Sequence, residues 1–552
     1  MEIIKKIKDI RRFEQIIGAL FKYEFGFIIK SLKLKDHLSL QQRLQKERFE
    51  ETETKPYKIR LLMQELGGAF IKLGQLLSLR PDILPKEYII ELEKLQDEVP
   101  PFPFEQVKKE IENEFKKPLN NIFSNFEERP IAAASIAQVH KAKLKTGELV
   151  AVKVQRPNIK EIMEHDIDLM FYFANLLEKH FPSLQEYRPV GVVEEFSKWT
   201  HRELNFKIEQ KNAKIFRSNF ENSKTVYIPK VYEEYTTDKI LTLEFLDAVE
   251  LHNIEEVKKK EINIEKIIKN GFEASLTQIF VHGFFHADPH PGNILVLKNN
   301  VISFVDFGIV GYFDEDLKKK CMDLFCGVIE NDVDKITQVF LEMGLMEDKD
   351  LTLFKIDLEE IIKPLQTASL NDIKISYVLE EVLGLAHKHK VKFPLDFVLF
   401  GKTIVTLEGI ALKFNPDFKL VKSSKTFLRK LIKKKTSPKY IYSRLIYQSN
   451  KLKDFIINLP EKTNLLLGKA KEADYDLKSI DKDIRTLTVE MDKSSNRVTL
   501  GLIITALIIA SAFLMPYNQI SFLDMPLFSF FGFSLAFFLI ILLIASIIKE
   551  KR

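Results

Sequence analysis

The sequence predicts an α+β protein with a two-lobed body, a helical extension before that body and two membrane-spanning helices at the C-terminal end. Three observations lead to this prediction. Short apolar runs separated by turn residues at 131–154 indicate a small antiparallel sheet. A polar loop followed by a hairpin at 282–311 brings acidic and amide side chains together. Two uncharged segments, 498–515 and 527–548, can each cross a hydrocarbon core, which takes about 20 residues.

The polar loop belongs to the segment HGFFHADPHPGNILVLKNNVISFVDFGIVG, residues 282–311. Its two short apolar runs are separated by a turn with an asparagine pair, which is typical of a β-hairpin. Asp288 and Asn293 precede the hairpin and Asp306 follows it, so we expect the three side chains at one end. Oxygen ligands suit Mg²⁺ that carries nucleotide phosphates. The alternative is an ordinary polar loop.

The spacing of these residues is that of protein kinases. An aspartate, an asparagine five positions later and then Asp-Phe-Gly form the catalytic-loop and metal-loop pattern of that fold. Upstream, a strand at 149–154 contains Lys153, and it follows a turn of small residues and a strand at 136–142. Lys153 could be an edge residue of the sheet, but its distance in sequence from Asp288 favours a phosphate-binding lysine. We therefore expect a two-lobed, protein-kinase-like fold.

The extension before the sheet is expected to be helical. Basic amphipathic helices are expected within residues 1–50, either on a membrane surface or packed on the rest of the protein. Residues 58–80 predict one long helix, on which Lys72 and Gln75 share a face. Gly74 suggests that a neighbouring backbone comes close, because a glycine inside a helix costs about 1 kcal/mol relative to alanine. Further helices are expected at 85–99 and 104–115.

The charged segment 190–220 is also expected to be helical, and it contains Glu203 and Glu209. Six residues correspond to about 120° around a helix of 3.6 residues per turn, so the two carboxylates cannot serve one lysine from one face. They either serve two different lysines or lie in solvent. A strand at 240–244 then leads to the hinge between the lobes, and a helix at 264–281 leads to the catalytic loop.

The C-terminal part predicts a membrane anchor. Lys or Arg flanks both uncharged segments, whereas the connector between them has neither, which predicts a cytoplasmic body with a short loop outside. We expect a multi-pass protein of the inner (cytoplasmic) membrane. Eight Lys or Arg residues at 422–439 suit contact with anionic lipids, although a solvated helix face is the alternative.

Composition excludes a few classes of protein. The formal net charge is +5 with 83 basic side chains, so nucleic acid is not an expected partner. Cys321 and Cys326 are too few for a disulfide framework and lack the spacing of metal ligands, which fits a reducing compartment. The basic N-terminus leads into no continuous apolar segment, so we expect no cleaved signal peptide.

Together these patterns predict six regions. They are basic N-terminal helices (1–57), a helical extension (58–128), an N-lobe with inserted helices (129–246), a C-lobe (247–420), a basic and charged helical linker (421–497) and two transmembrane helices (498–548).

Four motifs carry a family resemblance that runs from about residue 58 to the C-terminus. They are Lys72-Leu73-Gly74-Gln75, Ala132-Ala133-Ala134-Ser135, Glu203 with Glu209, and HADPHPGN with Asp306-Phe307-Gly308. The chain resembles the UbiB (AarF) family of atypical protein-kinase-like proteins, with its KxGQ motif and its Ala-rich loop in place of the kinase Gly-rich loop. The family has an aspartate where this chain has Asn205, so the role of that position is open.

The resemblance implies a role for each motif. Lys153 would pair with Glu209 and contact ATP phosphates beneath the Ala-rich loop. Lys72 would pair with Glu203 and hold the KxGQ helix, with Gly74 and Gln75, across the place where a kinase admits a peptide.

The remaining positions concern the reaction. Asp288 would occupy the position of the catalytic base, and Asn293 and Asp306 would bind Mg²⁺. The resemblance further implies a role in the biosynthesis of ubiquinone or related isoprenoid quinones, through ATP binding or hydrolysis. Expected partners are inner-membrane lipids and quinone-biosynthesis enzymes or quinone precursors.

Ordinary protein phosphorylation is not the expected activity. The catalytic loop lacks the arginine that receives an activation-loop phosphate, and no Ala-Pro-Glu follows. Alanines also restrict the backbone where kinases use glycines, so the phosphate cover should be stiffer.

Three other functions remain open. A metal hydrolase could use His282, His286, Asp288 and His290 as ligands, and it would bind Zn²⁺ but not ATP. A nucleotide-binding pseudokinase scaffold could organise membrane enzymes without turnover. A true protein kinase would phosphorylate another polypeptide.

Overall fold

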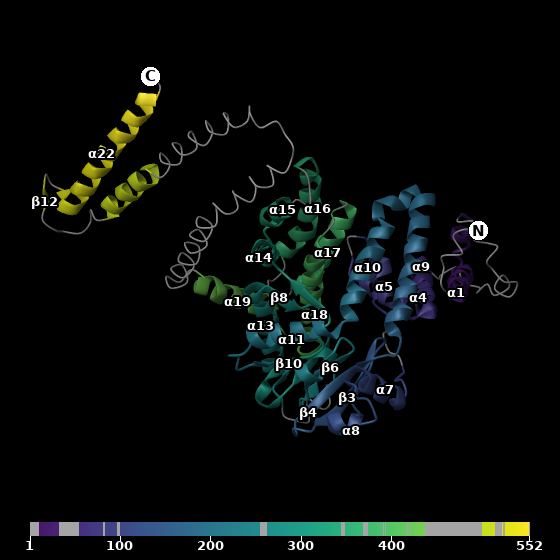
Figure 1. Cartoon of the computed structure of the whole chain (residues 1–552). Coiled ribbons are helices and arrows are strands. Elements are labelled where there is room, and N and C mark those ends of the chain that lie inside the picture. The colour runs from purple at the N-terminus through teal and green to yellow at the C-terminus, as the bar shows by residue number, and fades with distance from the viewer. Residues whose placement is uncertain are drawn as a thin grey trace, which may run out of the picture. The chain divides into compact units, whose positions relative to one another are not determined.

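The structure is a computed structural model, shown in Figure 1, in which the chain forms two compact units, Met1–Lys433 and Lys434–Arg552. It describes residues 10–31, 54–80, 83–95, 100–253, 262–343, 348–367, 374–389, 391, 393–416, 418, 420–435, 500–513, 521–522 and 525–550.

The N-terminal lobe is built on a five-stranded antiparallel sheet. Its strands pair in the order β1-β3-β4-β6, with β2 on β3. They are β1 (Phe123–Phe126), β2 (Ala132–Ala133), β3 (Ala137–Leu144), β4 (Leu149–Gln155) and β6 (Ile240–Glu244). Side chains alternate along β4, so Val150, Val152 and Val154 are fully buried under α7 (Phe104–Phe115) while Lys153 points to the other face. The strands predicted around Lys153 are therefore confirmed.

The hairpin predicted after the polar loop is also confirmed. β9 (Ile294–Val296) and β10 (Ile302–Phe304) pair antiparallel. Asn299 and Asn300 turn the chain at φ 62° and 59°, which asparagine tolerates better than most residues. A four-stranded sheet forms in the order β5-β10-β9-β7, and β8 pairs with β11 beside it. Their bounds are β5 (Val226–Tyr227), β7 (Val249–Glu250), β8 (Phe284–His286) and β11 (Val310–Tyr312).

Helices build the remainder of the second lobe around an apolar core that includes Phe280, Phe325 and Phe400, all fully buried. The predicted helix 264–281 is α13 followed by a π turn at Gln278–His282. The helices of this lobe are α13 (Ile264–Thr277), α14 (Glu315–Glu330), α15 (Val333–Glu342), α16 (Asp348–Thr367), α17 (Ile375–Lys388), α18 (Leu395–Phe414) and α19 (Leu420–Lys435).

The N-terminal extension and the inserted helices lie together, and Figure 1 shows α9 and α10 side by side. The predicted single helix at 58–80 is wrong, because Gly67 and Gly68 take positive φ values of 64° and 45° and divide it. The predicted segment 190–220 likewise forms two helices. The helices are α1 (Ile10–Lys22), α2 (Gly26–Ser31), α4 (Lys55–Leu66), α5 (Gly68–Ser78), α6 (Lys86–Leu92), α8 (Leu119–Ile122), α9 (Ile159–His180), α10 (Pro189–Glu203) and α11 (Phe206–Asn219).

The first helix packs on the body, which was one of its two predicted placements. Phe13 of α1 is 3% exposed and stacks on Phe173 of α9, with ring centroids 5.6 Å apart. Arg12 adds an ion pair of 2.7 Å with the buried Asp166. Apolar and charged contacts therefore both join α1 to α9.

The second unit is described only in part. It contains helical residues 500–513, the strands β12 (Ser521–Phe522) and β13 (Met525–Pro526), and α22 (Leu527–Glu550). Within the described residues, no helix combines the length and the apolar character that a membrane crossing needs. The predicted transmembrane hairpin is therefore not confirmed, and most of the linker 421–497 lies outside the described residues.

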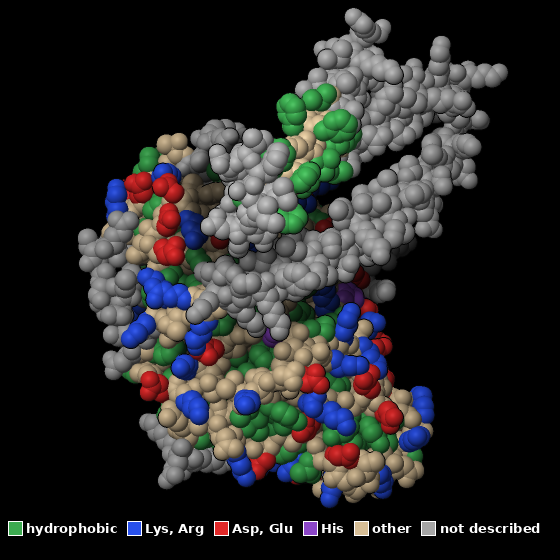
Figure 2. Space-filling view, turned by 90° about the vertical axis from the view of Figure 1, so that its left-hand side faces the viewer, with side chains coloured by type: hydrophobic (Ala, Val, Ile, Leu, Met, Phe, Trp, Pro, Cys, Tyr) green, Lys and Arg blue, Asp and Glu red, His purple; other side chains and the backbone are tan. Residues whose placement is uncertain are grey.

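On the face of the molecule drawn in Figure 2, Lys and Arg side chains alternate with Asp and Glu over the described surface. In the coloured part of that face, no large patch consists only of basic or only of acidic side chains.

Candidate functional site

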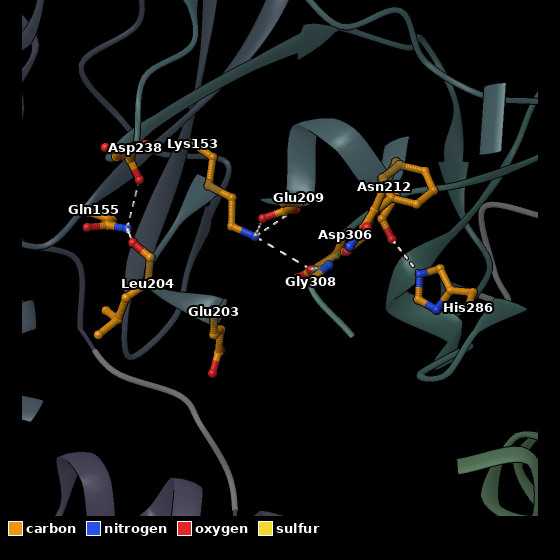
Figure 3. Close-up of polar contacts among 12 residues, drawn as sticks. Lys153, Gln155, Glu203, Leu204, Glu209, Asn212, Asp238, His286, Asp306 and Gly308 are labelled. Carbon is orange, nitrogen blue, oxygen red and sulfur yellow. Dashed lines mark hydrogen bonds and ion pairs between the residues drawn. The ribbon is translucent and has the colours of Figure 1, made fainter. Parts of the chain in front are cut away.

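The site is centred on the ammonium group of Lys153, which lies between carboxylates from two elements. Lys153 Nζ is 3.1 and 3.0 Å from the two carboxylate oxygens of Glu209 on α11. It lies 3.5 Å from Oδ1 of Asp306, which follows β10. Figure 3 shows the ammonium pointing into the space between these two carboxylates. The structure thus joins residue 153 of β4, residue 209 of α11 and residue 306 after β10.

The charges of this cluster shift one another's titration. Burial would lower the pKa of Lys153, but the carboxylates of Asp306 and Glu209 outweigh it and raise that pKa above its ordinary value. Burial raises the pKa of Glu209, although Lys153 opposes this. Lys153 lowers the pKa of Asp306 below its ordinary value. The carboxylates outnumber the ammonium, so a bound cation would be favoured here.

One face of helix α11 positions both Lys153 and the Asp-Phe-Gly segment. The side chain of Asn205 caps the helix by accepting a hydrogen bond from the Lys207 N–H at 3.0 Å. Asparagine and aspartate cap helices about equally well, so Asn205 can fill the capping role that an aspartate would fill. One turn beyond Glu209, the Asn212 amide donates to the Phe307 carbonyl at 2.9 Å. The same helix therefore holds both Lys153 and the Asp-Phe-Gly segment.

The Asp-Phe-Gly segment has a tight local turn. Asp306 has φ 61°, a left-handed conformation that is uncommon outside glycine. Its Oδ1 accepts from the Gly308 N–H at 3.2 Å, while the Phe307 ring is fully buried beside Phe216, with centroids 5.1 Å apart. Buried Phe307 anchors the turn, and this leaves the Asp306 side chain half exposed at the site.

The catalytic loop is fixed by hydrogen bonds from a buried histidine. The Asp288 N–H donates to Nδ1 of His286 at 3.2 Å, so Nε2 carries the proton and donates to the Val305 carbonyl at 3.1 Å. Asn293 donates its amide hydrogens to the Asp288 carbonyl at 3.1 Å and to Oδ2 of Asp288 at 3.2 Å. Asp288 and Asn293 are therefore brought together, as the hairpin predicts.

The alanine-rich loop is partly a paired strand. Ala132 and Ala133 form β2 against β3, and the Ala134 N–H donates to the Ala137 carbonyl at 2.8 Å. Ser135 is buried. The Arg156 guanidinium donates to the Ala134 carbonyl at 2.9 Å and to the Pro100 carbonyl at 2.8 Å. These bonds support the expectation of a stiff loop on grounds other than its alanine content.

The KxGQ helix, α5, reaches the site through an ion pair. Lys72, 3% exposed, lies 2.6 Å from Oε1 of Glu203 at the end of α10. The charge of Glu203 also raises the pKa of Lys153, so Glu203 lies within electrostatic reach of both lysines. Glu203 and Glu209 thus pair with different lysines, although from two helices and not one. Gln75 instead donates to the Leu95 carbonyl at 3.3 Å.

Gly74 is needed for a different reason than the sequence suggests. A Cβ at this position would overlap the Leu95 side chain and would lie 2.7 Å from the sulfur of Met63. The expected close neighbour is therefore a set of side chains from α4 and from the turn after α6, and not a backbone.

Gly74→Ala should lower the thermal unfolding midpoint of the full chain. Overpacking lowers the free energy of unfolding by about 1–3 kcal/mol. The higher helix propensity of alanine offsets about 1 kcal/mol of this loss. Gly409→Ala on α18 is the matched control, because no atom lies within 4 Å of a Cβ built there, and it should leave the midpoint unchanged or raise it. Equal midpoints for the two variants would show that the space around Gly74 is not tight.

The side-chain oxygen atoms available at the site suit a magnesium ion better than a zinc ion. Asn293 uses its amide nitrogen toward Asp288, which leaves its oxygen for a cation. The described residues hold no group of three or more His, Cys, Asp or Glu placed to bind a metal. Both ring nitrogens of His286 are engaged, so the zinc-hydrolase ligand set does not assemble. Mg²⁺ needs few protein ligands when phosphates and waters complete its shell.

Two positioning residues, Asn212 and Gln155, were missed in the sequence, and the role of Asn205 was left open. Asn212 follows Glu209 by three positions and so shares its face, which could have indicated it. Asn205 precedes an amphipathic helix, a capping signal. Gln155 donates to the Leu204 carbonyl at 2.6 Å and so fixes the end of α10, but no local pattern indicates this contact.

Comparisons with known proteins identify the relatives of this chain. The ABC1 atypical kinase-like domain matches residues 94–340, the UbiB helical domain residues 358–419, and the ABC1/UbiB kinase-like C-terminal domain residues 482–549.

Individual relatives agree with these domain matches. A "Probable protein kinase UbiB" of Shewanella sp. (strain W3-18-1) is 36% identical over 408 residues, 72% of this chain and 74% of the relative. "Protein ACTIVITY OF BC1 COMPLEX KINASE 7, chloroplastic" of Arabidopsis thaliana is 33% identical over 79% of this chain and 63% of that protein. A solved Mycobacterium tuberculosis structure, titled as the Rv3197–erythromycin complex, is 24% identical over 65% of this chain and 95% of that chain, with a TM-score of 0.40.

Proposed function

The chain belongs to the UbiB/ABC1 family of atypical kinase-like proteins, and from this premise we propose that it binds Mg·ATP and supports isoprenoid quinone biosynthesis. ATP hydrolysis, or transfer of the phosphoryl group to a small or lipid-linked molecule, is the proposed reaction. The observation that carries the proposal is the Lys153 ammonium held by Glu209 and Asp306. The residue before Asp306 is joined to the catalytic loop, because the Val305 N–H donates to the Asn293 carbonyl at 3.0 Å.

Each residue of this cluster has a task in that reaction. Lys153 binds phosphate oxygens and is oriented by Glu209. Asp306 and Asn293 would hold Mg²⁺, which when bound neutralises phosphate charge. Asp288 accepts the proton of the attacking hydroxyl or water, while the bond from the terminal phosphorus to the ADP oxygen breaks and ADP leaves. His286 keeps Asp288 in place through the hydrogen bond to its backbone.

The quinone part of the proposal is supported by family membership and by the KxGQ helix. α5 is joined to α10 by the ion pair Lys72–Glu203, and Arg80, two residues after α5, pairs with Glu195 of α10. The family resemblance implies that this helix lies across the place where a kinase admits a peptide, which favours a small or lipid-linked substrate over a polypeptide.

ATP turnover by the purified full chain tests the proposal. We expect Mg²⁺-dependent turnover that rises with vesicles of anionic lipid and with quinone-precursor mimics, and that is lost in Lys153→Met. Absence of Mg²⁺-dependent turnover under all these conditions, with nucleotide still bound, would favour a pseudokinase scaffold. Transfer of labelled phosphate to an added polypeptide at a comparable rate would favour a protein kinase.

We also propose that the C-terminal unit anchors the chain in the inner membrane through residues 498–548. Removal of residues 498–552 should release the protein from membranes, or leave only attachment through the basic segment that is lost in high salt. Fractionation of cells in low and high salt measures this. A truncated protein that stays in the membrane fraction in high salt would contradict the anchor and point to the N-terminal helices.

A further inference from the structure

The catalytic loop carries no lysine or arginine, since its sequence from residue 286 to residue 293 is HADPHPGN. Phosphoryl transfer spreads negative charge over the oxygens of the transferred group, and enzymes place cations against that charge. Lys153 supplies one cation from the β4 side of the site. A cation on the Asp288 side has to come from another element.

Lys402 of α18 brings a cation to that side. Its Nζ lies 3.5 Å from Oδ1 of Asp288. The two side chains are 35% and 34% exposed, so the pair faces solvent on one side. An ion pair with that much exposure contributes at most about 1 kcal/mol to stability. Fold stability alone therefore gives little reason for a lysine to face this aspartate.

The backbone that carries Lys402 is held firmly. Phe400 is fully buried, and its ring lies 5.9 Å from that of Phe313. At the start of the helix, Asp396 Oδ1 accepts from the Tyr312 N–H at 3.0 Å. Both partners belong to the segment that follows Asp-Phe-Gly. α18 therefore presents a flexible four-carbon side chain from a fixed position beside the catalytic loop.

The distances needed for reaction limit how far a transferable phosphoryl group can lie from Asp288. A base lies about 2.6–3.2 Å from the oxygen whose proton it accepts, and that oxygen lies about 3–3.5 Å from the atom it attacks. The phosphorus would thus lie no more than about 7 Å from the Asp288 carboxylate. Rotation about its side-chain bonds would let the Lys402 ammonium, 3.5 Å from Asp288 Oδ1, turn from Asp288 toward a phosphoryl group bound within that distance.

We propose that Lys402 contacts the terminal phosphoryl group of bound ATP and is thereby the residue that distinguishes ATP from ADP in this site. Without nucleotide it pairs with Asp288, and with ATP bound it turns to the phosphate and frees Asp288 to accept a proton. This inference rests on the proposed function, and it identifies which residue recognises the terminal phosphate.

Equilibrium binding of Mg·AMP-PNP and Mg·ADP to the full chain tests the inference. Losing a charged hydrogen bond corresponds to about tenfold or more in affinity, so Lys402→Met should weaken AMP-PNP by at least about tenfold while ADP affinity stays within about twofold of wild type. Lys413→Met, at the exposed end of the same helix, is the matched control and should leave both affinities unchanged. Unchanged AMP-PNP affinity in Lys402→Met, or an equal loss for both nucleotides, would overturn the assignment.

A second variant separates this role from a structural one. Lys402 also interacts electrostatically with Glu93, directly after α6, and could tether the extension. Glu93→Gln should leave both affinities as in wild type. If it reproduces the Lys402→Met pattern, the lysine acts through the extension and the assignment is wrong. Wild-type protein that binds neither nucleotide would overturn the proposed function itself, whereas normal binding that Lys402→Met does not alter overturns only the role of Lys402.

Discussion

Asp306→Asn is expected to reduce Mg²⁺-dependent ATP turnover by about 10²–10³-fold, the loss seen when one preorganised electrostatic contact is removed. The amide keeps the shape of the side chain and can still accept from the Gly308 N–H. Asparagine also tolerates the φ of 61° found at this position. The substitution therefore removes the charge that would hold Mg²⁺ and leaves the turn intact.

Steady-state turnover at saturating Mg·ATP measures this effect. Asp316→Asn is the matched control, because it makes the same change in net charge at a side chain that is 71% exposed on α14. It should behave as wild type. Equal turnover and equal Mg·ATP affinity in Asp306→Asn and wild type would refute the kinase-like assignment of the site.

Lys72→Ala is expected to change both stability and nucleotide preference. The ammonium of Lys72 is buried 2.6 Å from Oε1 of Glu203, and the second oxygen of Glu203 has no hydrogen-bond partner among the described residues. Losing one member of a buried charge pair costs about 3–5 kcal/mol. The uncompensated charge of Glu203 would also act more strongly on Lys153. We therefore expect altered nucleotide affinity or new autophosphorylation, together with failure to support quinone production.

Two variants separate the charge from the packing of this helix. Lys72→Arg keeps the charge with a different shape, so a partial defect is expected. Arg80→Ala removes the ion pair between the segment just after α5 and Glu195 of α10 and should loosen the helix without changing nucleotide preference. Wild-type nucleotide affinity, no autophosphorylation and full quinone production in Lys72→Ala would show that α5 serves only packing.

The local part of the site could be predicted because its signals are close in sequence. Asp288, Asn293 and Asp306 lie within one loop and hairpin, and two apolar runs separated by an asparagine pair determine how that hairpin pairs. Lys153 was found because it lies in an apolar strand that follows a turn of small residues, at a distance in sequence from Asp288 that is typical of kinases. Periodicity and spacing were sufficient in these cases.

Helix boundaries and long-range contacts could not be predicted in the same way. The segments 58–80 and 190–220 each read as one helix, whereas the backbone turns at Gly67 and Gly68 and the cap at Asn205 divide them. Lys402 reaches Asp288 from a helix far along the chain, so no spacing rule indicates it. Gly74 indicated a close neighbour, but the sequence does not show whether that neighbour is a side chain or a backbone.

Binding of ATP to the purified full chain, titrated with Mg²⁺ and again after chelation with EDTA, tests the central claim most directly. Saturable binding that requires Mg²⁺, and that is lost in Lys153→Met, is the predicted result. Affinity that is unchanged by removing Mg²⁺ and by Lys153→Met, or no binding at all, would contradict a nucleotide site at Lys153, Glu209 and Asp306.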